Sequence, residues 1–231
     1  MEQNKRMIKL SSILGIAGFL IYLGLMILEQ FYWKNVLAQS TGDILAAFGS
    51  PPHSQVTIGS HLLMAVAGIL FIPAFLGLKK LLEIEKERFS ITLGTIFGII
   101  ASAIMVIQMS VQGTVMVKMG KMYLAASEES QKQIISILYK GVRNFDIGID
   151  LAFDCFFFTA WILFGYAMLK SKFFGRIFGS LGIILFSLTA LINIWTAPNP
   201  PSIEIGPLVS LWVLAVFIQM YRAFRKLSPT S

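Results

Sequence analysis

The chain has 231 residues and a formal net charge of +7; 56% of its residues are hydrophobic and only 13% are charged. A soluble domain usually contains about 25% charged residues, so a soluble fold of this size would lack polar side chains to cover its apolar ones. The composition therefore excludes an ordinary soluble domain and favours helices in a lipid bilayer, where the outward surface stays apolar.

Six apolar segments follow one another along the chain, and each has about the 20 residues that a membrane-spanning helix needs. Five of them contain no charged residue, and the fourth is interrupted by Asp150 and Asp154. The basic first ten residues lead into a long apolar run, which favours a retained helix over a cleaved signal peptide. The sequence predicts an all-α fold, an integral membrane bundle of six transmembrane helices in a single domain over 1–231, with helices at about 8–29, 57–80, 90–118, 145–169, 175–196 and 205–224.

The links between these segments differ in character. Residues 49–52, Gly-Ser-Pro-Pro, are a turn signal before the second helix. Residues 129–141 carry apolar residues at helical spacing, so they either lie as a helix at the outer membrane interface or extend the fourth helix. Residues 197–202, Ala-Pro-Asn-Pro-Pro-Ser, cannot form a regular helix, because proline removes a backbone donor and clashes with the preceding turn.

The basic residues predict the orientation of the bundle. They lie in short clusters between apolar segments, a pattern that fits orientation signals better than a nucleic-acid partner. Thirteen of them flank the segments on the side that holds both termini, and the other six of the 19 lie on the opposite side. Because positive loops stay in the cytoplasm, both termini are predicted to be cytoplasmic.

Glycines recur near the starts of the first, third and fifth segments. Either a two-helix repeat or small residues at helix contacts would explain them, and contacts are the simpler expectation. The glycines are Gly15, Gly18, Gly94, Gly98, Gly175, Gly179 and Gly182.

With this orientation, most polar residues at membrane depth fall in the outer half of the bundle. Asp146, Asp150 and Asp154 are spaced four residues apart, so they form one stripe about 12 Å long on the fourth helix. A charged carboxylate costs roughly 2.5–3.5 kcal/mol at the bilayer centre, so the stripe is predicted to face the bundle interior. The candidate ligand-binding residues are Glu29, His61, Gln108, Gln112, Asp146, Asp150, Asp154, Asn193 and Trp195.

A purely structural interpretation of the same residues stays open. Asp146 is then an exposed residue at the entry of its helix, with Arg143 three positions earlier as its partner. The two deeper aspartates form hydrogen bonds between helices, to His61, Gln112 or Asn193, and such polar residues commonly hold helices together in lipid. Trp195, like Trp33 and Tyr32, lies where an aromatic belt is expected.

Three functions are compatible with this pattern. The first, slightly favoured, is binding or transport of a small molecule or cation at a polar pocket in the outer half of the bundle. The second is a membrane-embedded enzyme that modifies lipid, with Asp150 or Asp154 and His61 as an acid–base or metal pair. The third is a non-catalytic partner subunit. No motif for a metal, a cofactor or a nucleophile is present in the sequence, so the catalytic residues are unknown and no metal or cofactor is expected.

The second half of the chain also resembles a known family. Residues 150–195, DLAFDCFFFTAWILFGYAMLKSKFFGRIFGSLGIILFSLTALINIW, are followed by a proline-rich link and by GPLVSLWVLAVFIQMYR. This stretch resembles a family of uncharacterised bacterial multi-pass membrane proteins, a domain of unknown function. The resemblance implies six helices and a bacterial plasma membrane, and it implies no activity and no site residues.

Overall fold

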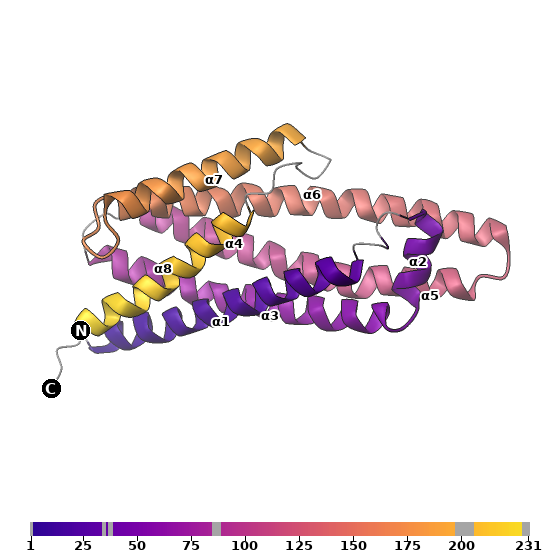
Figure 1. Cartoon of the computed structure of the whole chain (residues 1–231), viewed down its shortest axis with the longest axis horizontal. Coiled ribbons are helices and arrows are strands. Elements are labelled where there is room, and N and C mark those ends of the chain that lie inside the picture. Colours follow the sequence, from indigo (N-terminus) through magenta and orange to yellow (C-terminus); the bar gives the residue numbers. More distant parts are fainter. Residues whose placement is uncertain (1, 34–35, 37–38, 85–88, 197–205, 228–231) are drawn as a thin grey trace. The chain divides into compact units, whose positions relative to one another are not determined.

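A computed structural model describes residues 2–33, 36, 39–84, 89–196 and 206–227. In this part of the chain the secondary structure is helical, and the helices are labelled in Figure 1. They are α1 (Glu2–Trp33), α2 (Thr41–Gly49), α3 (His53–Glu83), α4 (Phe89–Val111), the π-helix η1 (Gln112–Met116), α5 (Val117–Ala125), α6 (Glu129–Met168), α7 (Arg176–Thr196) and α8 (Gly206–Leu227).

The all-α membrane fold predicted from the sequence is confirmed. Six helical segments of the described chain are long and apolar enough to cross a membrane, with α4, η1 and α5 together forming one of them. Residues 129–141 are continuous with the fourth span, since α6 is a single helix of 40 residues. Its length of about 60 Å exceeds the roughly 30 Å hydrocarbon core of a bilayer. The proline-rich link at 197–202 and the predicted helix start at 205 lie outside the described residues.

The short helix α2 was not predicted from the sequence. It begins after Ser40, whose hydroxyl accepts a hydrogen bond from the backbone N–H of Asp43 at 3.3 Å and donates one to its carboxylate at 2.6 Å. The first of these bonds satisfies one backbone donor at the helix start, and the second holds the two side chains together. The helix ends at Gly49, directly before the predicted Ser-Pro-Pro turn.

The chain groups into two compact units. Unit 1 contains residues 1–20, 68–103 and 152–231, and unit 2 contains residues 21–67 and 104–151. Four helices, α1, α3, α4 and α6, contribute residues to both units. The short elements α2, η1 and α5 belong to unit 2, whereas α7 and α8 belong to unit 1.

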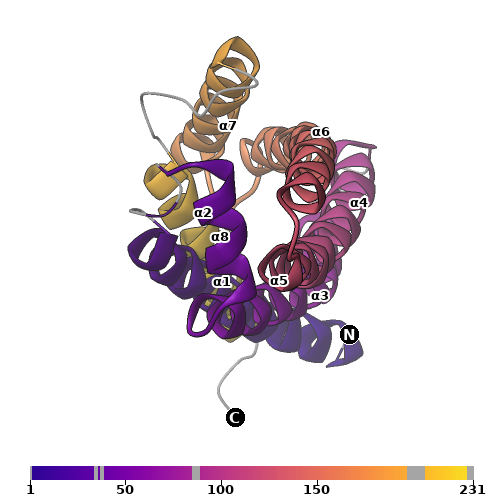
Figure 2. The same ribbon diagram turned by 90° about the vertical axis from the view of Figure 1, so that its right-hand side faces the viewer.

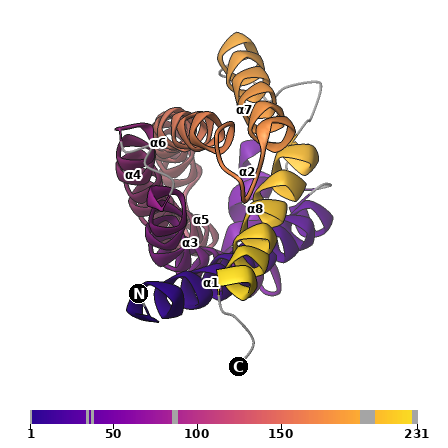
Figure 3. The same cartoon turned by 90° about the vertical axis from the view of Figure 1, so that its left-hand side faces the viewer.

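Unit 1 has an aromatic core. The fully buried Trp161 ring lies 5.4 Å from the Phe75 ring and 5.4 Å from the Trp212 ring, centroid to centroid. Phe164, Phe186 and Phe217 complete this cluster. Figure 3 shows α7 beside α8 within the unit, where the Trp212 indole donates a hydrogen bond to the Phe178 carbonyl at 3.2 Å. Edge-on and offset ring pairs of this kind add to the stabilisation from buried area.

Glycines let backbone and rings approach closely in unit 1. A Cβ atom at Gly15 would lie 2.6 Å from the Phe217 ring, and one at Gly98 would lie 2.9 Å from the Phe75 ring. Such distances are too short for real carbon atoms, which agrees with the expectation of small residues at helix contacts. Gly175, in the short link between α6 and α7, has a φ of +83°, a conformation that glycine adopts without strain.

Candidate functional site

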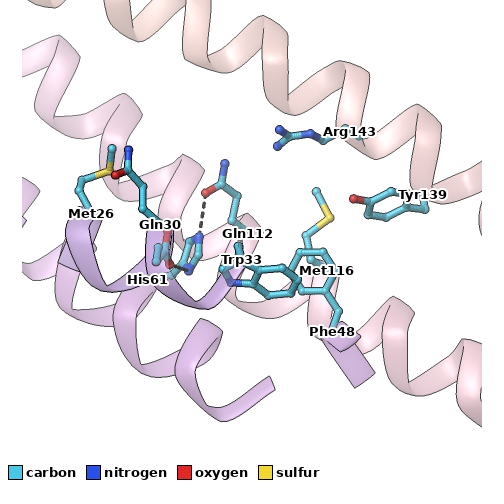
Figure 4. Close-up of a pocket in the computed structure, with 10 residues that line it drawn as sticks. Met26, Gln30, Trp33, Phe48, His61, Gln112, Met116, Tyr139 and Arg143 are labelled. Carbon is cyan, nitrogen blue, oxygen red and sulfur yellow. Dashed lines mark hydrogen bonds and ion pairs between the residues drawn. The ribbon is translucent and has the colours of Figure 1, made fainter. Parts of the chain in front are cut away.

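Unit 2 contains a pocket with a volume of about 560 Å³. Its lining residues come from α1, α2, α3, η1 and α6, and Figure 4 shows Tyr139 and Arg143 extending from α6 into the same space as Gln112 and Met116. The lining residues are Met26, Glu29, Gln30, Trp33, Phe48, His61, Gln112, Met116, Tyr139 and Arg143. Aromatic and sulfur-containing side chains thus share one cavity with charged and amide side chains.

A chain of hydrogen bonds forms the polar wall of this pocket. It begins on α1, where the Glu29 carboxylate accepts a hydrogen bond from the Ser60 hydroxyl at 2.6 Å and lies 3.0 Å from Nδ1 of His61. The same ring nitrogen lies 2.8 Å from the Thr57 carbonyl oxygen. The carboxylate therefore joins α1 to α3 through two side chains.

The series of hydrogen bonds continues to α6 through the side-chain amide of Gln112. Oε1 of Gln112 lies 2.8 Å from Nε2 of His61, while its Nε2 donates to both carboxylate oxygens of Asp146 at 2.9 Å. Nη1 of Arg143 donates to Oδ2 of the same aspartate at 2.9 Å. Asp146 is only 1% exposed, so its charge is balanced inside the protein rather than by bulk water.

Both ring nitrogens of His61 face hydrogen-bond acceptors in this arrangement. Nδ1 faces a carbonyl oxygen and the Glu29 carboxylate, which are both acceptors, so it carries a hydrogen. The amide nitrogen of Gln112 is committed to Asp146, so its oxygen faces Nε2 of His61, which must also donate. An imidazole with two N–H donors would match these acceptors, and the Glu29 carboxylate 3.0 Å away would balance its charge.

A break in helix regularity places Gln112. The π-helix η1 begins at this residue, and such single-turn bulges are frequent at functional sites. The next residue, Gly113, is buried, and a Cβ atom there would lie 2.9 Å from Cβ of His61. The missing side chain lets η1 approach α3 closely enough for the hydrogen bond between His61 and Gln112.

A second close approach places α2. Gly49 of α2 faces Gly120 of α5, where a Cβ atom on either residue would collide with the backbone of the other helix. Figure 2 shows these two helices side by side within unit 2. The contact positions Phe48 on the pocket, where its ring centroid lies 4.4 Å from that of Trp33 and 6.3 Å from that of Tyr139.

The candidate residues separate into three groups. Glu29, His61 and Gln112 line the pocket, and Asp146 lies directly behind its wall. Asp150 is exposed and accepts a hydrogen bond from the buried Gln108 amide at 3.1 Å, outside the pocket lining. Asp154 accepts one from Asn193 at 2.7 Å in unit 1, and Trp195 is 89% exposed.

Two structural expectations for the aspartates were partly right. Arg143 does pair with Asp146, but that aspartate is buried, not exposed, because Gln112 covers its second oxygen. Asp154 does bond to Asn193 on another helix. Asp150 bonds instead to Gln108, which was not among the predicted partners His61, Gln112 and Asn193.

Several lining residues were not among the candidates. Trp33 was predicted to lie in an aromatic belt at the membrane interface, but its side chain is buried against Phe48. The spacing of Tyr139 and Arg143, four residues apart, was a usable signal, because it places both on one helix face. Phe48 could be found only with α2, through its Ser40–Asp43 start.

No group of three or more His, Cys, Asp and Glu side chains among the described residues is placed to hold a metal ion. Comparisons of the chain with family models, with curated proteins and with solved structures found no match.

Proposed function

We propose that this protein is a multi-pass membrane protein that binds a small amphipathic molecule in the pocket of unit 2. The observation that carries the proposal is the cavity itself, whose volume of about 560 Å³ falls within the roughly 300–1,000 Å³ of small-molecule sites. Trp33, Phe48 and Met116 give it an apolar wall, and His61 and Arg143 give it a polar one. A ligand with an apolar body and a polar end satisfies both walls.

The engagement of the polar side chains favours binding over acid–base catalysis. Both ring nitrogens of His61 point at protein acceptors, so neither presents a lone pair to a substrate. Both oxygens of Asp146 accept hydrogen bonds from Gln112, and one also accepts from Arg143. A general base needs a free acceptor within reach of the proton that it removes.

The proposal places the pocket near the outer membrane interface. Both termini are cytoplasmic in it, because 13 of the 19 basic residues flank the spans on that side. From the end of α6 at Met168 back to Arg143 the helix rises about 38 Å, more than the hydrocarbon core of about 30 Å. A fluorescent protein fused to the C-terminus should therefore fluoresce in cells, whereas alkaline phosphatase fused there should be inactive; the opposite result would reverse the orientation.

The bacterial plasma membrane is part of the same proposal. It is supported by the resemblance of residues 150–195 to a family of uncharacterised bacterial membrane proteins and by the six apolar spans. Separation of membranes from cells of the source organism, with an antibody to the chain, would test this location.

The binding proposal is tested with a neutral probe, 8-bromo-1-octanol, and the protein in phosphatidylcholine nanodiscs. Bromine quenches tryptophan fluorescence at near contact, and Trp33 lines the pocket, whereas Trp161 and Trp212 are buried in unit 1. The exposed Trp195 is first replaced, as Trp195→Phe, to remove background quenching by probe in the lipid. Saturable quenching that disappears in a second variant, Trp33→Phe, is expected. Quenching that rises linearly and equally in both proteins would overturn the proposal.

A further inference from the structure

We propose that the ligand of this pocket is anionic, with a negatively charged headgroup held by Arg143 and an apolar body against Trp33 and Phe48. The inference rests on the proposed binding function and names the chemical class of its ligand. It follows from which charged side chains of the wall still have hydrogen-bonding capacity.

The two carboxylates of the wall differ in how far they are engaged. The Glu29 side chain is 21% exposed and lies against both the Ser60 hydroxyl and His61. The Asp146 side chain is 2% exposed, and both of its oxygens accept hydrogen bonds. A cationic ligand would have to displace Gln112 or Arg143 to reach Asp146, and at Glu29 it would meet a carboxylate whose Oε1 already lies 3.0 Å from the His61 ring.

The Arg143 side chain is more exposed than either carboxylate. The Arg143 side chain is 49% exposed, and its contact with Asp146 uses Nη1. A guanidinium carries five N–H donors, so the contact leaves donors that can reach a ligand in the cavity. Arginine binds carboxylate and phosphate groups through two parallel hydrogen bonds, a geometry that its planar fork favours.

Neighbouring groups strengthen this preference. Arg143, His61 and one carboxylate, Glu29, line the pocket, and a second carboxylate, Asp146, lies behind the wall against Arg143. The Tyr139 hydroxyl lies on the same face of α6 as Arg143, four residues away, and Figure 4 shows both side chains directed into the pocket. The hydroxyl adds a neutral donor beside the guanidinium.

The opposite part of the lining is suited to an apolar chain or ring. Trp33 and Phe48 pack ring against ring, and Met26 and Met116 contribute flexible apolar side chains. Methionine adapts to ligands of different shape. The ligand class is therefore an amphiphile with one anionic end, either a soluble acid or an anionic lipid that enters from the bilayer.

The test compares three probes of equal length in phosphatidylcholine nanodiscs with the Trp33 quenching assay: 8-bromooctanoate, 8-bromooctylammonium and 8-bromo-1-octanol. We expect the carboxylate to bind at least about tenfold more tightly than the ammonium, as a charge-assisted pair with arginine implies. Arg143→Gln should abolish this preference, while Arg143→Lys, which retains the cation beside Asp146, should keep most of it. Saturable octanol binding in both variants shows that the pocket is intact.

A second arm identifies the source of the anion. Phosphatidylglycerol is added to the nanodiscs, and binding of the neutral octanol is measured. Displacement of octanol from the wild type but not from Arg143→Gln supports an anionic lipid as the ligand, and a preference for octanoate without such displacement supports a soluble acid. Equal affinities for the charged probes, or a preference for the ammonium, would overturn the inference and leave the binding proposal standing. Failure of all three probes to quench saturably would overturn both.

Discussion

Unit 1 and unit 2 draw on the same four helices, α1, α3, α4 and α6, and yet they are filled in different ways. The interior of unit 1 is a cluster of aromatic rings around Trp161, with glycines at the closest contacts. Unit 2 holds a continuous series of charged and amide side chains, from Glu29 to Arg143, beside a cavity.

The two interiors differ in how they are expected to contribute to stability. Packed rings gain dispersion energy over many contacts, although the indole N–H of Trp161 at the centre of the cluster is buried without a hydrogen-bond partner. A buried charged network costs desolvation energy and is often no more stabilising than an apolar replacement. Unit 2 also has a buried apolar cluster, which includes Leu45, Met116 and Ile135, so its polar wall stands beside apolar packing and does not replace it.

The largest expected effect concerns the core of unit 1. Trp161→Ala removes a fully buried indole, so the free energy of unfolding should fall by about 3–5 kcal/mol. Thermal unfolding in detergent micelles measures the change. The matched control, Trp195→Ala, removes the same side chain from an 89% exposed position and should change the stability by less than about 0.5 kcal/mol. Similar losses in both variants would contradict the description of unit 1 as an aromatic core.

A smaller effect is expected in the polar wall. Asp146→Asn removes the charge that Gln112 and Arg143 stabilise, and should cost about 1.5–3 kcal/mol. Asp150→Asn, one helical turn away, alters an exposed carboxylate with a single bond to Gln108 and should cost less than about 0.5 kcal/mol. The free energy of unfolding is measured for both variants in parallel. Equal losses would mean that the two aspartates share one environment, as the stripe in the sequence implied.

The smallest effect tests the approach of η1 to α3. Gly113→Ala places a methyl group 2.9 Å from Cβ of His61, so it should destabilise by about 1–3 kcal/mol and weaken probe binding. Gly59→Ala makes the same change on α3 with no atom within 4 Å, and should stabilise the helix by up to about 1 kcal/mol. Opposite signs in the two unfolding midpoints are expected. A stabilising Gly113→Ala would show that the two helices can separate without cost.

Much of the fold could be predicted from the sequence because membrane insertion depends on local composition. Each span is recognisable alone, since about 20 apolar residues suffice to cross the bilayer whatever they pack against. The Gly-Ser-Pro-Pro turn at the end of α2 and the salt bridge between Arg143 and Asp146 could also be predicted, because in each case the residues involved are close in sequence. The short helix α2 was missed because its 9 residues are too few for a span, although Ser40 and Asp43 gave a usable start signal.

The candidate site was predictable only in part. Sequence position singled out the polar residues but could not assign their partners, because Gln112 bonds to His61 across 51 positions and to Asp146 across 34. The π-helix that starts at Gln112 leaves no mark in a hydropathy pattern, since it depends on how η1 packs against α3.

The sequence by itself determined that this chain is an all-α membrane protein with six spans, because hydrophobicity acts residue by residue. The tertiary structure decided which polar residues meet. It divided the aspartate stripe of α6 into a buried member, an exposed member and one paired in unit 1, and it joined Trp33, Phe48 and Arg143 around one cavity. The physical reason is that a hydrogen bond or a ring contact needs two partners, and here the partners come from helices distant in sequence.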